Sequence, residues 1–210
     1  MKDLLLNNSL ILHHKSVGTI SVNEKCISGA ISLNDNIACC RCIPFFVNSC
    51  EKEVFNFYSH DAVVLINIEE YLNNLKMTGR RCDYLLYDEN KIMLADLTCS
   101  MEEYLHPHLM LGEMQQGKRL TARQQIEHTL ALLTEAPDIA EYINRKSIKI
   151  GLLAYRIKDE DLFADIPKQM QELLAAWLAM ENELEMRKLK FPMSHGFSFE
   201  MIKYPNVYQW

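Results

Sequence analysis

Apolar residues near the start of the chain come in short β-branched runs that Gly and Asn interrupt. Such runs are typical of strands when turn-forming residues bound them, and they fall at residues 17–22, 27–32 and 43–47. The pattern predicts a β-rich N-terminal section over residues 1–62, which packs on the rest of the protein or extends its sheet.

From residue 63 onward, stretches with helical spacing of apolar residues alternate with stretches typical of strands. The expected elements, in chain order, are a helix over 66–77, a hairpin over 82–99, a helix over 117–133, a strand over 147–157, a helix over 165–189 and a strand over 195–203. This order predicts an α/β (α+β) core over residues 63–210, in which helices flank a mixed sheet.

Each strand of the predicted hairpin carries one aspartate inside an otherwise apolar run. If Glu89 and Asn90 form the turn, counting back along both strands sets Asp83 opposite Asp96. Opposed residues of an antiparallel pair share a face, with Cβ atoms roughly 4.5–5.5 Å apart, and like charges repel at that separation. Burying ionised carboxylates is costly unless a partner or a metal compensates them, so we expect a cation beside this pair.

A divalent ion would turn the aspartate pair into a functional site. Mg²⁺ or Mn²⁺, bound by two carboxylates, water and a substrate phosphate, is the usual occupant of such a cluster. Thr98 follows Asp96 by two residues and therefore shares its strand face. In the alternative interpretation, the strands twist past the edge of the core, and the aspartates are solvated or paired with one of Arg80, Arg81 and Lys118.

The hairpin and its neighbours resemble the restriction-endonuclease-like superfamily of nucleases, whose signature is PD-(D/E)-x-K. Residues 82–86 (Cys-Asp-Tyr-Leu-Leu) resemble the first signature strand, residues 95–98 (Ala-Asp-Leu-Thr) the second, and residues 122–126 the helix that follows. The resemblance covers residues 66–157. It implies a core with an acid-bearing helix, a signature hairpin, a helix, a strand and a further helix.

The resemblance implies hydrolysis of phosphodiester bonds with Mg²⁺ or Mn²⁺ as the cofactor. Asp83 and Asp96 would be the catalytic metal ligands, Glu70 or its neighbour Glu69 a further ligand or water contact, and Gln125 a donor that orients the site. The ion would polarise the phosphate and lower the pKa of a bound water molecule.

The signature lysine is where this chain departs from the family. Thr98 stands at the position of that lysine, and threonine supplies no positive charge. The expected substitute is a basic residue at the start of the next helix, which offers Lys118, Arg119 and Arg123.

Two functions follow from the resemblance. With a basic side chain in place, the protein is a metal-dependent nuclease, and DNA is the expected substrate. Without one, the same fold is a catalytically inactive subunit that acts in nucleic-acid binding or complex assembly, beside a protein partner such as an ATPase. The basic residues expected to contact phosphates, or else to form a solvated face, are Arg80, Arg81, Arg119 and Arg123.

Composition and charge narrow the alternatives. The net charge of −6 argues against nucleic-acid binding by bulk electrostatics and leaves only local basic clusters for that work. The first apolar run is short and contains Asp3, unlike a signal peptide or a membrane span, so we expect a cytoplasmic protein without a membrane partner. Reduced thiols are the expected state of the seven cysteines, although Cys39, Cys40 and Cys42 form a weak zinc motif that lacks paired C-x-x-C spacing.

Other residues suit further chemistry less well. Residues 106–108 (His-Pro-His) resemble metal ligands but match no standard spacing, and a surface loop is the ordinary interpretation. Cys99 could act as a nucleophile with His106 or His128 as base, although a thiol inside an apolar strand is usually inert. The aromatic tail over residues 204–210 either stacks on bases or covers the core.

Overall fold

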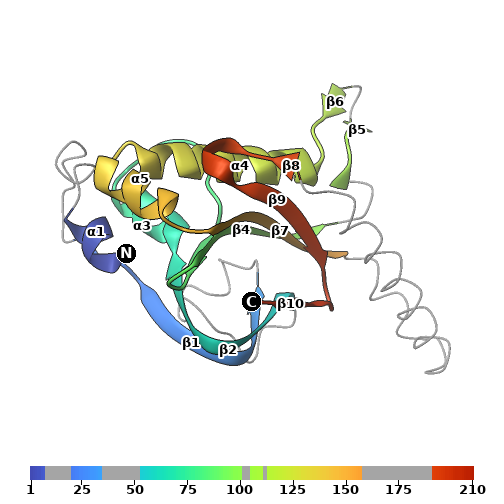
Figure 1. The fold of residues 1–210 in the computed structure, drawn as a ribbon. Coiled ribbons are helices and arrows are strands. Elements are labelled where there is room, and N and C mark those ends of the chain that lie inside the picture. The colour runs from blue at the N-terminus through green and yellow to red at the C-terminus, as the bar shows by residue number, and fades with distance from the viewer. Residues whose placement is uncertain (8–19, 35–52, 101–104, 111–112, 158–190) are drawn as a thin grey trace.

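A computed structural model describes residues 1–7, 20–34, 53–100, 105–110, 113–157 and 191–210. It confirms the predicted α/β class, because its main feature is a mixed sheet of eight strands with helices packed on it (Figure 1). The elements in chain order are α1 (Lys2–Leu6), β1 (Glu24–Asn34), β2 (Glu53–Asn67), α3 (Ile68–Asn74), β3 (Tyr84–Tyr87), β4 (Lys91–Ser100), β5 (His108–Met110), β6 (Glu113–Gln115), α4 (Lys118–Thr134), α5 (Pro137–Asn144), β7 (Ile148–Ile157), β8 (Phe191–Pro192), β9 (Ser198–Lys203) and β10 (Val207–Gln209).

The observed elements agree with most of the predicted ones in the described residues. The strand expected at 27–32 lies within β1, and the elements expected at 117–133 and 147–157 are α4 and β7. In the strand expected at 17–22, the described residues 20–22 are not in a strand. The strand expected at 43–47 falls outside the described residues. The helix expected at 165–189 also lies outside them, as do Cys39, Cys40 and Cys42.

The helix predicted at 66–77 is shorter in the structure because β2 continues to Asn67. The Asn67 side chain accepts a hydrogen bond from Glu70 N at 2.9 Å, which is the N-cap contact that begins α3. β2 therefore crosses the predicted boundary between residues 1–62 and 63–210, and β1 and β2 lie in the same sheet as β3 and β4. The division of the chain into two sections stays a prediction.

Antiparallel and parallel pairs meet within the one sheet. The strand order is β1-β2-β3-β4-β7-β9-β8, where β2, β3 and β4 are antiparallel neighbours and β4, β7 and β9 are parallel ones. α4 and α5 form the crossover between β4 and β7, as parallel pairing requires.

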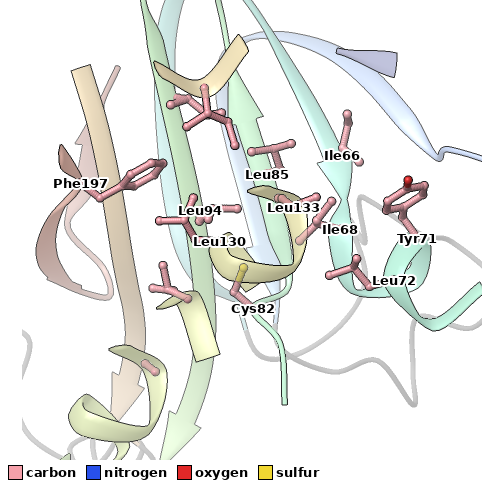
Figure 2. Packing of buried hydrophobic residues seen from close by; sticks show 14 of the residues in the cluster. Ile66, Ile68, Tyr71, Leu72, Cys82, Leu85, Leu94, Leu130, Leu133 and Phe197 are labelled. Carbon is pink, nitrogen blue, oxygen red and sulfur yellow. The ribbon is translucent and has the colours of Figure 1, made fainter. Parts of the chain in front are cut away.

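Side chains on the two faces of the sheet form two separate cores. On one face, residues of β3, β4, β7 and β9 pack under α3, α4 and α5. Figure 2 shows Leu85 and Leu94 of the sheet together with Leu130 and Leu133 of α4, with Cys82 beside them. On the other face, strand residues pack against the aromatic residues of β2 and β10.

The strand β2 closes the second core: β1 pairs along one of its edges, and two different strands share the other. Its C-terminal half pairs with β3, whereas Asn56, Phe57 and Tyr58 pair in parallel with β10. β1 and β2 accordingly curve below β4 and β7 to reach β10 in Figure 1. Residues 207–209 of the predicted aromatic tail thus form a strand of the sheet.

The C-terminal residue packs against the turn between β3 and β4. The Asp88 carboxylate accepts hydrogen bonds from Asn90 N at 2.7 Å and Lys91 N at 2.6 Å, and also from Trp210 Nε1 at 2.6 Å. Lys91 Nζ lies 4.3 Å from the centre of the Trp210 ring and 5.0 Å from that of Tyr208. Burial opposes the charge on Asp88, but these hydrogen bonds outweigh it and hold its pKa below the usual value.

Replacing Asp88 by Asn should lower the free energy of unfolding at pH 7 by about 1 kcal/mol, because the bond to Trp210 loses its charged acceptor. A carboxylate whose pKa is depressed by folding stabilises the protein above its unfolded pKa of about 3.9, and this contribution disappears as the pH falls through the folded pKa. The difference between wild type and Asp88→Asn should therefore shrink between pH 7 and pH 3 in urea unfolding.

Glu89→Gln provides the matched control, since it removes the neighbouring carboxylate of the same turn and that side chain is exposed. This variant should unfold like the wild type at both pH values. An Asp88→Asn difference that is equal at pH 7 and pH 3 would contradict the assignment.

Candidate functional site

The register of β3 and β4 sets the two hairpin aspartates side by side. Leu85 pairs with Leu94 and Tyr84 with Ala95, as predicted from the turn. Asp83 N donates to Ala95 O at 3.0 Å, although the paired positions of the two strands end at Tyr84 and Ala95. Asp83 therefore lies beside the segment of β4 that contains Asp96, at an irregular point just outside the regular ladder.

One aspartate is fixed by the backbone of the other strand. The Asp83 Oδ2 atom accepts a hydrogen bond of 2.6 Å from Leu97 N. Its own carbonyl accepts from Ile68 N at 3.0 Å, which ties the first turn of α3 to the same point. Asp83 is thus oriented by contacts from both α3 and β4.

The face of β4 that carries Asp96 changes from apolar to polar along the strand. Ile92 and Leu94 belong to the core under α4, and the following residues on the same face are the buried polar residues Asp96, Thr98 and Ser100. Asp96 is only 6% exposed. A buried polar row at the end of an apolar face is unfavourable for folding alone unless its groups are paired or hydrogen-bonded.

The segment before Asp83 is attached to α4 by hydrogen bonds. Cys82 N donates to Thr129 Oγ1 at 3.0 Å, and Gln125 Nε2 donates to Arg81 O at 2.9 Å. Burial raises the pKa of the Cys82 thiol well above its usual value, and the charges of Asp96 and Asp83 raise it further. The thiol is therefore neutral, and both carboxylates lie within electrostatic reach of it.

Gln125, predicted to orient the site, has a definite contact in the structure. Its amide binds the main chain of Arg81, two residues before Asp83, and so positions the strand that carries this aspartate. The predicted role as a donor to substrate stays a prediction.

The two arginines before the hairpin differ in burial. Arg80 is exposed, whereas Arg81 is 8% exposed and donates from Nη1 to Asn73 Oδ1. Burial lowers the pKa of Arg81, with nearby Glu69 opposing the shift, and its Nε finds no hydrogen-bond partner in the described part of the chain. Arg81 therefore packs α3 against the hairpin, and Arg80 alone of this pair is accessible to a phosphate.

The structure does not bring the predicted third ligand to the aspartates. Glu70 Oε2 accepts a hydrogen bond from Asn23 Nδ2 at 3.1 Å. Over the described ranges, no three of His, Cys, Asp and Glu are grouped so as to hold a metal ion. The donor set at this point is therefore two carboxylates, which fits Mg²⁺, an ion that takes one or two protein carboxylates and fills its other positions with water and phosphate.

A lysine that the sequence did not suggest lies on the same face. Tyr155 of β7 pairs with Thr98 on one side and with Lys203 of β9 on the other. Residues paired in this way share a face, so Lys203 lies at the level of Thr98, about 10 Å away at two strand spacings. Lys203 is 9% exposed. Only the parallel pairing of three strands reveals this relation, and no local sequence signal predicts it.

The basic residues of α4 are divided between its two sides. Lys118 precedes Gln125 by seven residues, two helical turns, and so lies on the side that faces the segment before Asp83. On the opposite side, Arg123 Nη2 donates to Pro192 O at 3.0 Å, and the Arg119 guanidinium lies 4.9 Å from the centre of the Phe191 ring. Lys118 thus lies on the same flank of α4 as Gln125, two turns nearer the start of the helix, and the two arginines do not.

The structure adds no support for a metal site at residues 106–108 or for Cys99 as a nucleophile. His106 is exposed, and the side chain of His108 is outside the description. Cys99 is partly exposed and points to the opposite face of β4 from Asp96.

Comparison of the chain with protein-family models, with curated proteins and with solved structures gives no match. Among the described helices, none combines the length and apolar character that crossing a membrane would demand.

If the aspartate pair binds a divalent ion, Mn²⁺ should raise the melting temperature by about 3–6 °C at roughly ten times its dissociation constant. Asp96→Asn should abolish the rise. The measurement is a thermal melt with EDTA and with added Mn²⁺.

Asp61→Asn is the matched control, because Asp61 is an exposed aspartate on β2 and its replacement should leave the rise unchanged. An equal rise in the Asp96→Asn variant would show that the ion binds elsewhere.

Proposed function

We propose that the protein is a divergent metal-dependent nuclease of the restriction-endonuclease-like class, which hydrolyses phosphodiester bonds of nucleic acid, with DNA as the substrate. The observation that carries the proposal is the position of Asp83 against the segment of β4 that contains Asp96, with Asp96 buried at the polar end of an apolar face. Two neighbouring carboxylates repel each other, and a cation bound between them would offset that repulsion.

The two aspartates would hold the ion between them. Mg²⁺ or Mn²⁺ bound at this position would neutralise the carboxylates and polarise the scissile phosphate. Asp83 is already fixed for this role by Leu97 N, so little side-chain entropy remains to be lost on binding. Glu70 could contribute only through water, given its bond to Asn23.

The charge that the family draws from its signature lysine would come from another element in this protein. Lys203 is the first candidate, because it is buried on the face of Asp96 at the level of Thr98. Lys118 is the second, because it lies on the side of α4 that faces the Asp83 strand. An ammonium group held in a water-poor site stabilises developing phosphate charge more strongly than one in solution.

A second function is supported by a different observation. Thr98 is buried where the signature lysine would stand, and no third acidic ligand joins the described aspartates. Both features suit a nuclease-fold subunit that has lost catalysis and acts in nucleic-acid binding or assembly, beside a partner such as an ATPase.

Incubation with plasmid DNA, linear DNA and RNA in Mg²⁺ or Mn²⁺ separates the two functions. We expect cleavage by the wild type, none in EDTA, and a loss beyond detection in Asp96→Asn. Replacement of the lysine that supplies the charge should lower kcat by about 10²–10³-fold with little change in KM. The variants to compare are Lys203→Met and Lys118→Met.

Lys149→Met is the matched control. Lys149 donates to His195 O and lies near the start of β7, away from Tyr155, so this variant should retain activity. Binding of DNA without any cleavage by the wild type would favour the inactive subunit instead. Cleavage that persists in Asp96→Asn would reject the site itself.

A further inference from the structure

A hollow of about 170 Å³ opens on the side of α4 opposite to the aspartate pair. It lies where β8 and β9 run alongside α4 in Figure 1. Its lining comes from the N-terminal half of α4, the segment that precedes β5, and the two strands, with the residues Leu105, Arg119, Leu120, Arg123, Phe191 and Phe199. No role in the proposed catalysis uses it.

Two guanidinium groups on its wall are held in place by the protein. Arg119 stacks against Phe191, and Arg123 donates to Pro192 O. Within the described ranges neither forms an ion pair with a carboxylate, because the ion pairs found there join Lys2 to Glu24 and Arg145 to Glu141. Both positive charges are therefore oriented by neutral groups and keep donors available for an anion.

Apart from His106, the rest of the wall is apolar. Leu105, Phe191 and Phe199 line it, and Leu120 is a large apolar side chain of α4 that is 41% exposed. The backbone of the segment before β5 lies so close to α4 that a Cβ atom at Gly117 would stand 2.3 Å from the carbonyl carbon of His106. This contact leaves the wall little freedom to collapse into the hollow.

Two positive groups beside an apolar wall indicate a ligand that has both an anionic part and an apolar part. A bare phosphate would leave the apolar surface without a partner, and an apolar ligand would leave two oriented guanidiniums unpaired. The volume is well below the roughly 300–1,000 Å³ of pockets that enclose drug-sized molecules, so the hollow holds one part of a ligand, such as a ring, while the rest lies at its open side. Guanidinium groups bind phosphate in a forked geometry and also stack on flat rings.

We propose that this hollow binds a single nucleotide, with the phosphate on Arg119 and Arg123 and the base against the apolar wall. The assignment of the nucleotide to the unpaired end of a nucleic-acid strand rests on the proposed function, whereas binding of the nucleotide itself does not. A free mononucleotide shares the same chemistry and is the other source.

The position of the hollow suits recognition of a strand end. Arg119 and Arg123 lie on one side of α4, and Gln125 and Thr129, which contact the strand of Asp83, lie on the other. A strand end in the hollow would leave cleavage to occur further along the strand, on the far side of the helix.

The test measures binding in EDTA with the Asp96→Asn variant as background, so that cleavage cannot interfere. Deoxyadenosine 5′-monophosphate, inorganic phosphate and a short single-stranded oligonucleotide with a 5′-phosphate are titrated by calorimetry. We expect the monophosphate to bind at least tenfold more tightly than phosphate. Equal affinities, or no binding of the monophosphate, would overturn the proposal.

Two variants locate the binding. Arg119→Gln should weaken binding of the monophosphate at least tenfold, and Arg145→Gln, which removes an exposed arginine at the C-terminal cap of α5, should not. Leu120→Glu removes no intramolecular hydrogen bond and places a carboxylate in the hollow, so it should also weaken binding at least tenfold. Its control is Ile148→Glu, at an apolar residue of β7 that is 50% exposed.

The two ligand sources separate in the same experiment. Tighter binding of the 5′-phosphorylated oligonucleotide than of the monophosphate identifies a strand end, and equal affinities identify a free nucleotide. Arg119→Gln and Leu120→Glu variants that bind like the background would overturn the site. Because no ion is present, a failed cleavage assay leaves this result unaffected.

Discussion

The pairing of β3 with β4 is the interaction on which the rest of the structure depends. Both faces of this pair are buried, with Leu85 and Leu94 under α4 and Tyr84 and Ala95 in the second core. A slip of one residue would exchange the faces of a strand and transfer its side chains to the wrong core. The burial that fixes this register also places Asp83 beside the segment that contains Asp96. The same packing that stabilises the fold therefore determines where the two aspartates lie.

The helix α4 connects the two regions that the structure singles out. Its apolar side packs on the sheet, one flank binds the segment that leads to Asp83, and the other flank binds residues before β9. A single rigid element therefore sets the position of both the aspartate pair and the arginine-lined hollow.

Local features of the fold were predictable, and long-range ones were not. The pairing of Leu85 with Leu94 follows from a tight turn and a count of residues, so it could be predicted from the hairpin alone. The burial of Arg81 depends on packing against α3, and the placement of Lys203 depends on parallel pairing across β4, β7 and β9. The pairing of β10 with β2 joins segments about 150 residues apart in sequence, which alternation of side chains cannot reveal.

The attachment of Trp210 to Asp88 has a consequence for the order in which the protein folds. These residues are 122 positions apart, whereas the hairpin itself needs only neighbouring residues. Contacts between distant segments must overcome the entropy of closing a long loop, so they form after the local ones. The second core is therefore completed only after β10 has been synthesised, much later than the pairing of β3 with β4.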